Sequence, residues 1–148
     1  MILQYKLNVL KYIVEDQFSY KFYYDNNGKS YYFFYEKGLS PRELIVRENG
    51  HHLMSQIYIK LYDCEKFIKF LRTIKSTKHR YKYNIDNEYY MYFNNRLYMN
   101  WNKEFYKYDE YALKCCCPNV KLKLNDIPIL IYALQDSVII KNYYDERL

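Results

Sequence analysis

The residues best suited to metal binding or nucleophilic catalysis are three histidines and four cysteines. The histidines are His51, His52 and His79, and the cysteines are Cys64 and the consecutive run 115–117. Structural zinc sites use paired ligands at regular spacing, and three adjacent cysteines do not converge easily on one tetrahedral ion. A catalytic histidine needs a carboxylate or a nucleophile beside it, which no motif here supplies. The sequence therefore predicts no metal site, no cofactor and reduced thiols.

The motifs of common enzyme classes are also missing from the sequence. Gly28, Gly38 and Gly50 lie too far apart to form a phosphate-binding loop, and there is no serine nucleophile elbow. Two acidic pairs occupy 15–16 and 109–110, but adjacent residues on a strand point to opposite faces and do not make a two-carboxylate site. We expect a non-enzymatic protein, and a small hydrolase or nuclease without a visible motif stays open as a third class.

The composition is that of a small globular protein rich in tyrosine. The chain has 148 residues, 50% of them hydrophobic, with 22 tyrosines and only three glycines. This length predicts a single compact domain over residues 1–148. The bias toward residues with AT-rich codons favours a low-GC genome, such as that of a low-GC bacterium, its phage or a large DNA virus. No apolar run nears the ~20 residues that span a bilayer, and the N-terminus has no signal-peptide pattern, so we expect a cytoplasmic protein without a membrane partner.

The elements that would position any functional residue begin with a hairpin. Segments 18–24 and 30–36 are rich in aromatic residues and flank Asn27-Gly28, a pair that supplies the positive φ values of a tight turn. This turn places six aromatic side chains on one face, which we expect to line the core: Tyr20, Phe22, Tyr24, Tyr31, Phe33 and Tyr35.

Two or three short helices are expected around an antiparallel, tyrosine-rich sheet, which makes the fold class α+β. Ser40-Pro41-Arg42-Glu43 is a capping box that predicts a helix ending near Asn49-Gly50. Asp63 is expected to cap a second helix, and a third begins at 126–128. Further strands are predicted at 3–9, 57–62, 119–124 and 138–140, and residues 80–101 are predicted to form a three-stranded meander.

The meander supplies the candidate binding face. Two-residue turns at Asp86-Asn87 and Asn94-Asn95 would place large side chains among basic ones on its more polar side. The predicted binding residues are Arg80, Lys82, Tyr89, Met91, Phe93, Arg96 and Tyr98. The alternative is that a helix covers this face too, and a one-residue error in either turn would move a whole strand to the opposite side.

Two functions suit an aromatic face with basic neighbours. Tyrosine and arginine are favoured anchors of protein interfaces, so the leading hypothesis is a protein that binds a protein partner, such as a phage or viral accessory protein that inhibits a host factor. The alternative is a single-stranded nucleic-acid-binding protein, because aromatic residues amid positive charge can stack on bases. The formal net charge of +6 and the pI near 8.9 suit nucleic acid or an acidic protein.

Overall fold

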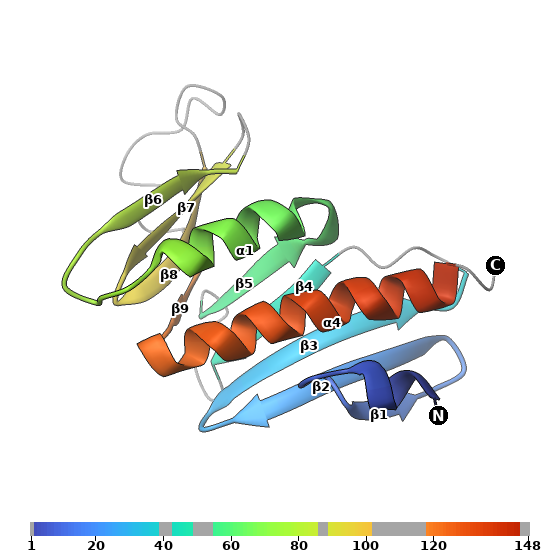
Figure 1. The fold of residues 1–148 in the computed structure, drawn as a ribbon. Coiled ribbons are helices and arrows are strands. Elements are labelled where there is room, and N and C mark those ends of the chain that lie inside the picture. Colours follow the sequence, from blue (N-terminus) through green and yellow to red (C-terminus); the bar gives the residue numbers. More distant parts are fainter. Residues whose placement is uncertain (1, 39–42, 49–54, 86–88, 102–117, 146–148) are drawn as a thin grey trace.

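The computed structural model describes residues 2–38, 43–48, 55–85, 89–101 and 118–145. Within these residues the chain forms two antiparallel sheets and two α-helices, which confirms the predicted α+β class (Figure 1). The five-stranded sheet has the order β1 (Tyr12–Glu15), β2 (Ser19–Asn26), β3 (Lys29–Glu36), β4 (Glu43–Glu48) and β5 (Gln56–Lys60). The four-stranded sheet has the order β6 (Tyr81–Asn84), β7 (Tyr89–Asn94), β8 (Arg96–Trp101) and β9 (Asn119–Lys121). The helices are α1 (Cys64–Thr73) and α4 (Ile127–Asp145), with short 3₁₀ helices η1 (Ile2–Lys6), η2 (Leu61–Asp63) and η3 (Leu124–Asp126).

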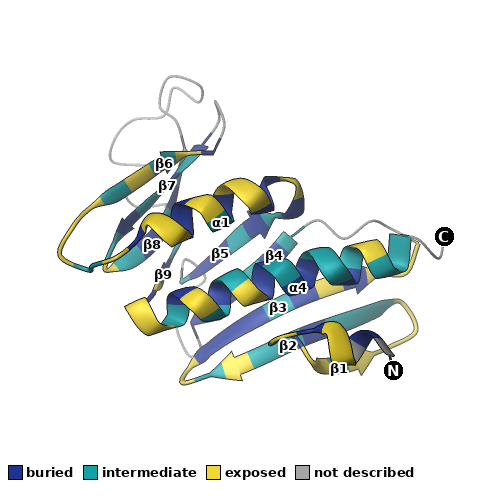
Figure 2. Ribbon diagram, viewed as in Figure 1, coloured by how far each residue is buried: buried dark blue, intermediate teal, exposed yellow. Residues whose placement is uncertain are grey.

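The predicted hairpin is confirmed as β2 and β3. Asn27 and Gly28 form its turn with φ values of 47° and 81°, and Asn26 pairs with Lys29. The register pairs the six predicted aromatic residues across the two strands, and Phe22, Tyr31, Phe33 and Tyr35 are buried. Figure 2 shows β3 as a largely buried strand and β1 as an exposed one.

Both helices lie on the same side of the five-stranded sheet and pack against each other (Figure 1). α4 covers the hairpin, and the Tyr144 ring near its end stacks on Tyr20 and Tyr35 with ring centroids 5.0 and 4.5 Å apart. α1 packs on β5 and on the four-stranded sheet, where the ring centroids of Phe70 and Tyr83 are 6.0 Å apart. One cluster of buried hydrophobic residues therefore includes side chains from both sheets and both helices.

Polar contacts join the layers at three places. The carboxylate of Asp136 on α4 is fully buried and accepts backbone N–H groups of Asn8 (2.8 Å), Val9 (2.7 Å) and Leu10 (3.0 Å). Lys29 at the start of β3 forms an ion pair with Asp126, just before α4. Three consecutive amides around one carboxylate hold the N-terminal segment against α4, because an unpaired buried charge would be costly.

The third polar link joins the two sheets. Glu48 of β4 is buried, with 8% of its surface exposed, and pairs with Arg96 of β8. The same carboxylate accepts the backbone N–H of Lys121 at 2.5 Å. Glu48 therefore links the end of β4 in the five-stranded sheet to β8 and β9 of the other sheet.

Four sequence predictions are corrected by the structure. Residues 43–48 form a strand and not a helix, because Leu44 and Val46 alternate into the core and pair with β3; residues 40–42 of the predicted capping box lie outside the described residues. The predicted strand at 3–9 is η1 and a turn, since the buried residues are Leu3, Leu7 and Leu10, a helical spacing.

The other two corrections concern α4 and the start of α1. The predicted strand at 138–140 is the continuation of α4, whose apolar side extends to the buried Ile140. Asp63 precedes α1 as expected, but its side chain makes no capping hydrogen bond and instead accepts the Tyr89 hydroxyl at 2.5 Å. The predicted apolar stripe of α1, including Phe67 and Leu71, is confirmed as buried.

Candidate binding surfaces

The seven predicted binding residues do not share one face. Tyr89, Met91 and Phe93 point into the core, with 1%, 0% and 0% of their surface exposed. Lys82 and Tyr98 lie on the opposite side of the four-stranded sheet, which faces away from α1, and Arg80 is exposed just before β6. Arg96 is on that side too, although its guanidinium pairs with Glu48 and its Nε donates to Asn119 Oδ1 at 2.5 Å.

The cause is the turn between β7 and β8. Asn94 pairs with Arg96, and Asn95 alone makes the turn with a φ of 61°. The expected two-residue turn would have paired Phe93 with Arg96, but Phe93 pairs with Leu97. A shift of one residue turns every side chain of β7 to the other face. The other expected turn, at Asp86-Asn87, lies outside the described residues. The register of β6 on β7 also differs from the expected one by one residue, because Lys82 pairs with Tyr92 and not with Met91.

Tyr90 and Tyr92 of β7 lie on the outer face of the four-stranded sheet, where Tyr89, Met91 and Phe93 were expected. Lys82 Nζ lies 4.2 Å from the ring centroid of Tyr90, a cation–π distance. The rings of Tyr92 and Tyr98 lie 5.9 Å apart as a cross-strand pair. This outer face therefore keeps the predicted mixture of tyrosine and positive charge with different members.

Positive charge is concentrated in one part of the chain. Between Lys66 and Ile85 there are seven lysine and arginine residues and no aspartate or glutamate. We call these residues the basic segment: Lys66, Lys69, Arg72, Lys75, Lys78, Arg80 and Lys82. The rest of the chain holds the other 16 basic residues and all 17 acidic ones, so the net charge of +6 arises in the basic segment.

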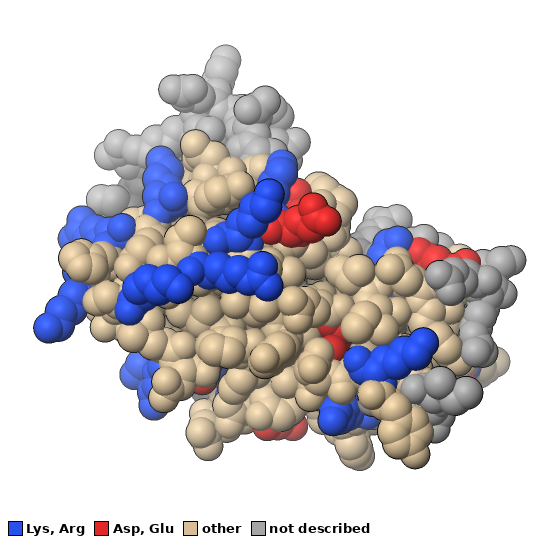
Figure 3. Space-filling view, viewed as in Figure 1, with Lys and Arg blue, Asp and Glu red and all other residues tan. Residues whose placement is uncertain are grey.

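The basic segment is a surface feature. All seven side chains are exposed, and the ion pairs between described residues use other cations, namely Lys29, Lys37, Arg96 and Lys141. Lysine and arginine side chains gather over α1 in Figure 3. From α1 the segment continues through the loop after Thr73 into β6, where Lys82 reaches the outer face of the four-stranded sheet.

The outer face of the five-stranded sheet has a different character. It lies opposite the helices, and Lys21 sits among three rings, 5.1 Å from Tyr23, 4.1 Å from Tyr32 and 5.5 Å from Phe34. Tyr12 packs edge-on against Tyr23 with centroids 4.5 Å apart. Several of its apolar side chains are open to solvent, including Tyr12 at 59%, Val14 at 45% and Phe34 at 43%.

Charge on that face is balanced. The strand register places three cations and three carboxylates on the outer side of β2 to β5: Lys21, Arg47, Lys60, Asp25, Glu36 and Glu43. An aromatic surface with balanced charge suits a protein better than a polyanion.

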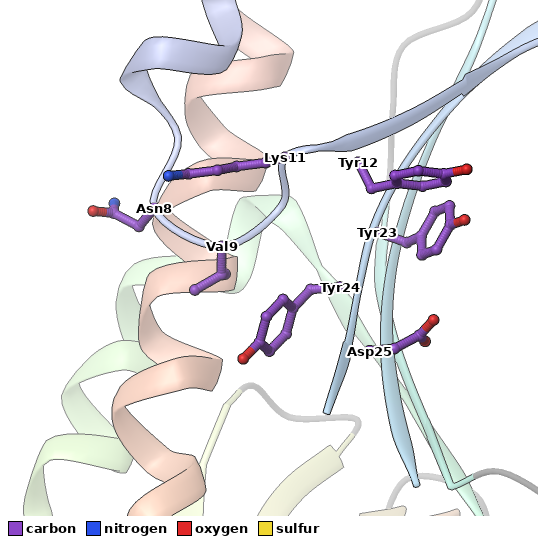
Figure 4. Close-up of a pocket in the computed structure, with 7 residues that line it drawn as sticks. All are labelled: Asn8, Val9, Lys11, Tyr12, Tyr23, Tyr24 and Asp25. Carbon is purple, nitrogen blue, oxygen red and sulfur yellow. The ribbon is translucent and has the colours of Figure 1, made fainter. Parts of the chain in front are cut away.

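The described surface also contains open hollows. One has a volume of about 460 Å³ and lies beside the N-terminal turn, where Figure 4 shows Lys11 and Tyr12 pointing to opposite sides. Partial burial against its neighbours raises the pKa of Tyr23 to about 12, helped by a hydrogen bond with Tyr12. Two others flank the exposed Leu124, with volumes of about 310 and 470 Å³.

No family model, curated protein or solved structure matches this chain.

The described residues hold no metal-binding cluster and no activated thiol. They include no group of three or more His, Cys, Asp or Glu side chains that would bind a metal ion. Cys64 is a free, buried thiol, and burial beside Asp63 raises its pKa to about 12, so it is protonated at neutral pH. His51, His52 and cysteines 115–117 lie outside the described residues.

Sequence inspection missed the basic segment for an identifiable reason. Its cations are spaced two or three residues apart and form no continuous run of basic residues. The informative signal was the absence of acidic residues over 66–85. Because α1 presents every third or fourth residue on one side, such spacing on a helix becomes a continuous exposed stripe.

Proposed function

We propose that this protein acts in the cytoplasm as a non-enzymatic binder of single-stranded nucleic acid, through the basic segment and the outer face of the four-stranded sheet. The observation that supports the proposal is the concentration of the whole net charge in seven exposed side chains without an intervening carboxylate. A surface of this kind attracts polyanions because each phosphate neutralised by lysine or arginine releases counterions.

The path of the basic segment favours a single strand over a duplex. Lys66, Lys69 and Arg72 are three residues apart on α1, which corresponds to about 4.5 Å of helix rise per step. The segment then passes around the edge strand β6 to the opposite side of the sheet, where Tyr90 and Tyr92 lie. A flexible strand can follow that edge with its phosphates and stack bases on tyrosine, whereas a duplex stays straight over about 150 base pairs.

The test is fluorescence anisotropy with labelled 20-nucleotide DNA and RNA strands and a DNA duplex, each at low and physiological salt. We expect single strands to bind more tightly than duplex. A Lys78→Ala, Arg80→Ala double variant should flatten the dependence of log K on log salt by about 1.4, because each phosphate contact contributes about 0.7. The matched control is Lys21→Ala, Arg47→Ala, which removes one lysine and one arginine from the outer face of the five-stranded sheet.

Two results would contradict this function. Absence of binding at low salt would mean that the basic segment does not bind nucleic acid. Equal loss in the control pair would show attraction by overall charge and not by the basic segment.

A second candidate function has its own observation. The exposed aromatic residues on the outer face of the five-stranded sheet, with balanced charge, support contact with a protein partner. With the low-GC composition, this candidate takes the form of a phage or viral accessory protein that inhibits a host factor. Phe34→Asp should then abolish capture of one identified partner, while Lys78→Ala, Arg80→Ala retains it. Capture that survives Phe34→Asp would exclude this face.

A further inference from the structure

β1 is an edge strand with an open backbone edge. Among the described residues it pairs only with β2. The Asp16 N–H donates to Ser19 O at 3.0 Å, so by alternation the backbone groups of Tyr12 and Val14 also face β2. The N–H and C=O groups of Ile13 and Glu15 therefore point away from the sheet.

The sequence of this strand is complementary to itself. Lys11-Tyr12-Ile13-Val14-Glu15 has a cation at one end, a carboxylate at the other and apolar residues between. The Glu15 carboxylate lies 3.0 Å from Lys37 Nζ of its own chain and stays half exposed, so its second oxygen can accept another cation. In an antiparallel pair centred on Ile13, Lys11 of one copy lies opposite Glu15 of the other, twice by symmetry. Each Tyr12 then lies opposite a Val14, and both residues are exposed in the single chain.

We propose that two copies of this chain associate through β1, as a two-fold antiparallel pair centred on Ile13 that joins two five-stranded sheets into one. The two Ile13 residues exchange N–H···O=C bonds, and each Glu15 N–H donates to the Lys11 carbonyl of the other copy. The Lys11 N–H stays with Val9 O, to which it donates at 2.9 Å.

A second copy of the chain fits this edge because the strand, turned antiparallel, places a complementary residue opposite each of its own. Opposite charges at the two ends favour an antiparallel copy and place like charges together in a parallel one. The pairing also extends the aromatic row of the outer face, since Tyr12 already packs on Tyr23. This inference is independent of nucleic-acid binding, which uses the other sheet.

The dimer is expected to be weak. A pair of five-residue strands buries less than the roughly 1,200 Å² of a standard stable interface. We therefore expect a dissociation constant in the range of weak complexes, about 10 μM to 1 mM. Sedimentation velocity of the full chain from about 10 μM to 1 mM should therefore show the mass rising toward that of a dimer.

Ile13→Pro tests the strand pairing directly. Proline removes the outward N–H of Ile13 but no hydrogen bond to β2, and edge strands tolerate it at such positions. We expect at least a tenfold weaker dimer with an unchanged circular dichroism spectrum. Ile13→Val is the matched control, since it keeps the N–H and should dimerise as the native chain does.

Charge reversal tests the register and the two-fold axis. Because Glu15 also pairs with Lys37 of its own chain, these variants are made in a Lys37→Ala background. There Lys11→Glu and Glu15→Lys should each weaken the dimer several-fold, and the double variant should restore it. A chain that stays monomeric at about 1 mM, a dimer unaffected by Ile13→Pro, a double variant without recovery, or a monomer whose edge takes up only unrelated peptides would each overturn the proposal.

Discussion

The outer faces of the two sheets both carry tyrosine and lysine, yet they differ in how charge is arranged. On the five-stranded sheet, Lys21 is surrounded by rings and three carboxylates balance three cations. On the four-stranded sheet, Lys82 belongs to a basic segment without acidic residues. Tyrosine does not distinguish the two faces in a chain with 22 of them, whereas the sign and density of charge do.

The side of β7 that faces solvent decides which residues form the outer face of the four-stranded sheet. Substitutions on its two sides should give the largest difference in unfolding free energy. Phe93→Ala should cost about 3–5 kcal/mol of unfolding free energy, because it leaves a cavity in the core, whereas Tyr92→Ala should cost less than about 1 kcal/mol. Urea unfolding of both variants measures the difference. The opposite order would restore the register expected from the sequence and return Phe93 to the outer face.

Charge reversal should separate the two faces by binding. Lys75→Glu, Lys78→Glu, Arg80→Glu is expected to weaken single-strand binding about 100-fold, or about 2.8 kcal/mol, because attraction becomes repulsion along the basic segment. The same reversal at Lys21, Arg47 and Lys60 changes total charge equally and should alter affinity by less than about threefold. Anisotropy titration at physiological salt measures both, and equal losses would erase the distinction.

The helix that covers the five-stranded sheet provides a third test. Asp136→Asn should lower the unfolding free energy by about 2 kcal/mol, because the amide replaces one acceptor oxygen and removes the charge that three backbone N–H groups bind. Asp25→Asn on the outer face is the control, since that carboxylate is exposed and bonds only to Ser30 in the described contacts. Equal stability of the two variants would mean that the N-terminal segment is held by its leucines alone.

The smallest expected effect lies in the β1–β2 turn. The N–H of Phe18, then that of Ser19, bind the Asp16 carboxylate and hold its pKa below the usual 3.8. A lowered folded-state pKa stabilises the protein above the unfolded pKa and loses that contribution as the pH falls. Asp16→Ala should therefore melt slightly earlier than the native chain at pH 7, and the gap should narrow as the pH falls below the unfolded value of 3.8 and through the lower folded-state pKa. A gap that is constant with pH would assign the effect to the side chain's packing.

Local signals in the sequence were sufficient where one residue type dictates the backbone. Asn27-Gly28 specified the hairpin and its register, because the positive φ values of that turn suit few other residues. The stripe of α1 was equally predictable, since Phe67 and Leu71 recur at helical spacing. The α+β class followed from these elements.

The structure of other elements depends on contacts between residues that are far apart in the sequence. The capping box at 40–43 is a valid helix signal, but Leu44 and Val46 gain more by pairing with β3. Residues 138–140 are β-branched and predict a strand in isolation, yet they continue a buried helix. The candidate face failed through one residue, since Asn95 alone makes a turn that two asparagines were expected to share.

The order of the elements has a consequence for synthesis on the ribosome. The five-stranded sheet is complete by residue 60, but the helix that covers its hairpin begins at residue 127. While the nascent chain grows through the intervening residues, the apolar side of β2 and β3 is without α4, and the amides of Asn8, Val9 and Leu10 are without Asp136. Exposed apolar sheet in a growing chain is where chaperones bind and where aggregation starts. The soluble yield of this protein should therefore increase when ribosome-associated chaperones are co-expressed, whatever the stability of the folded protein itself.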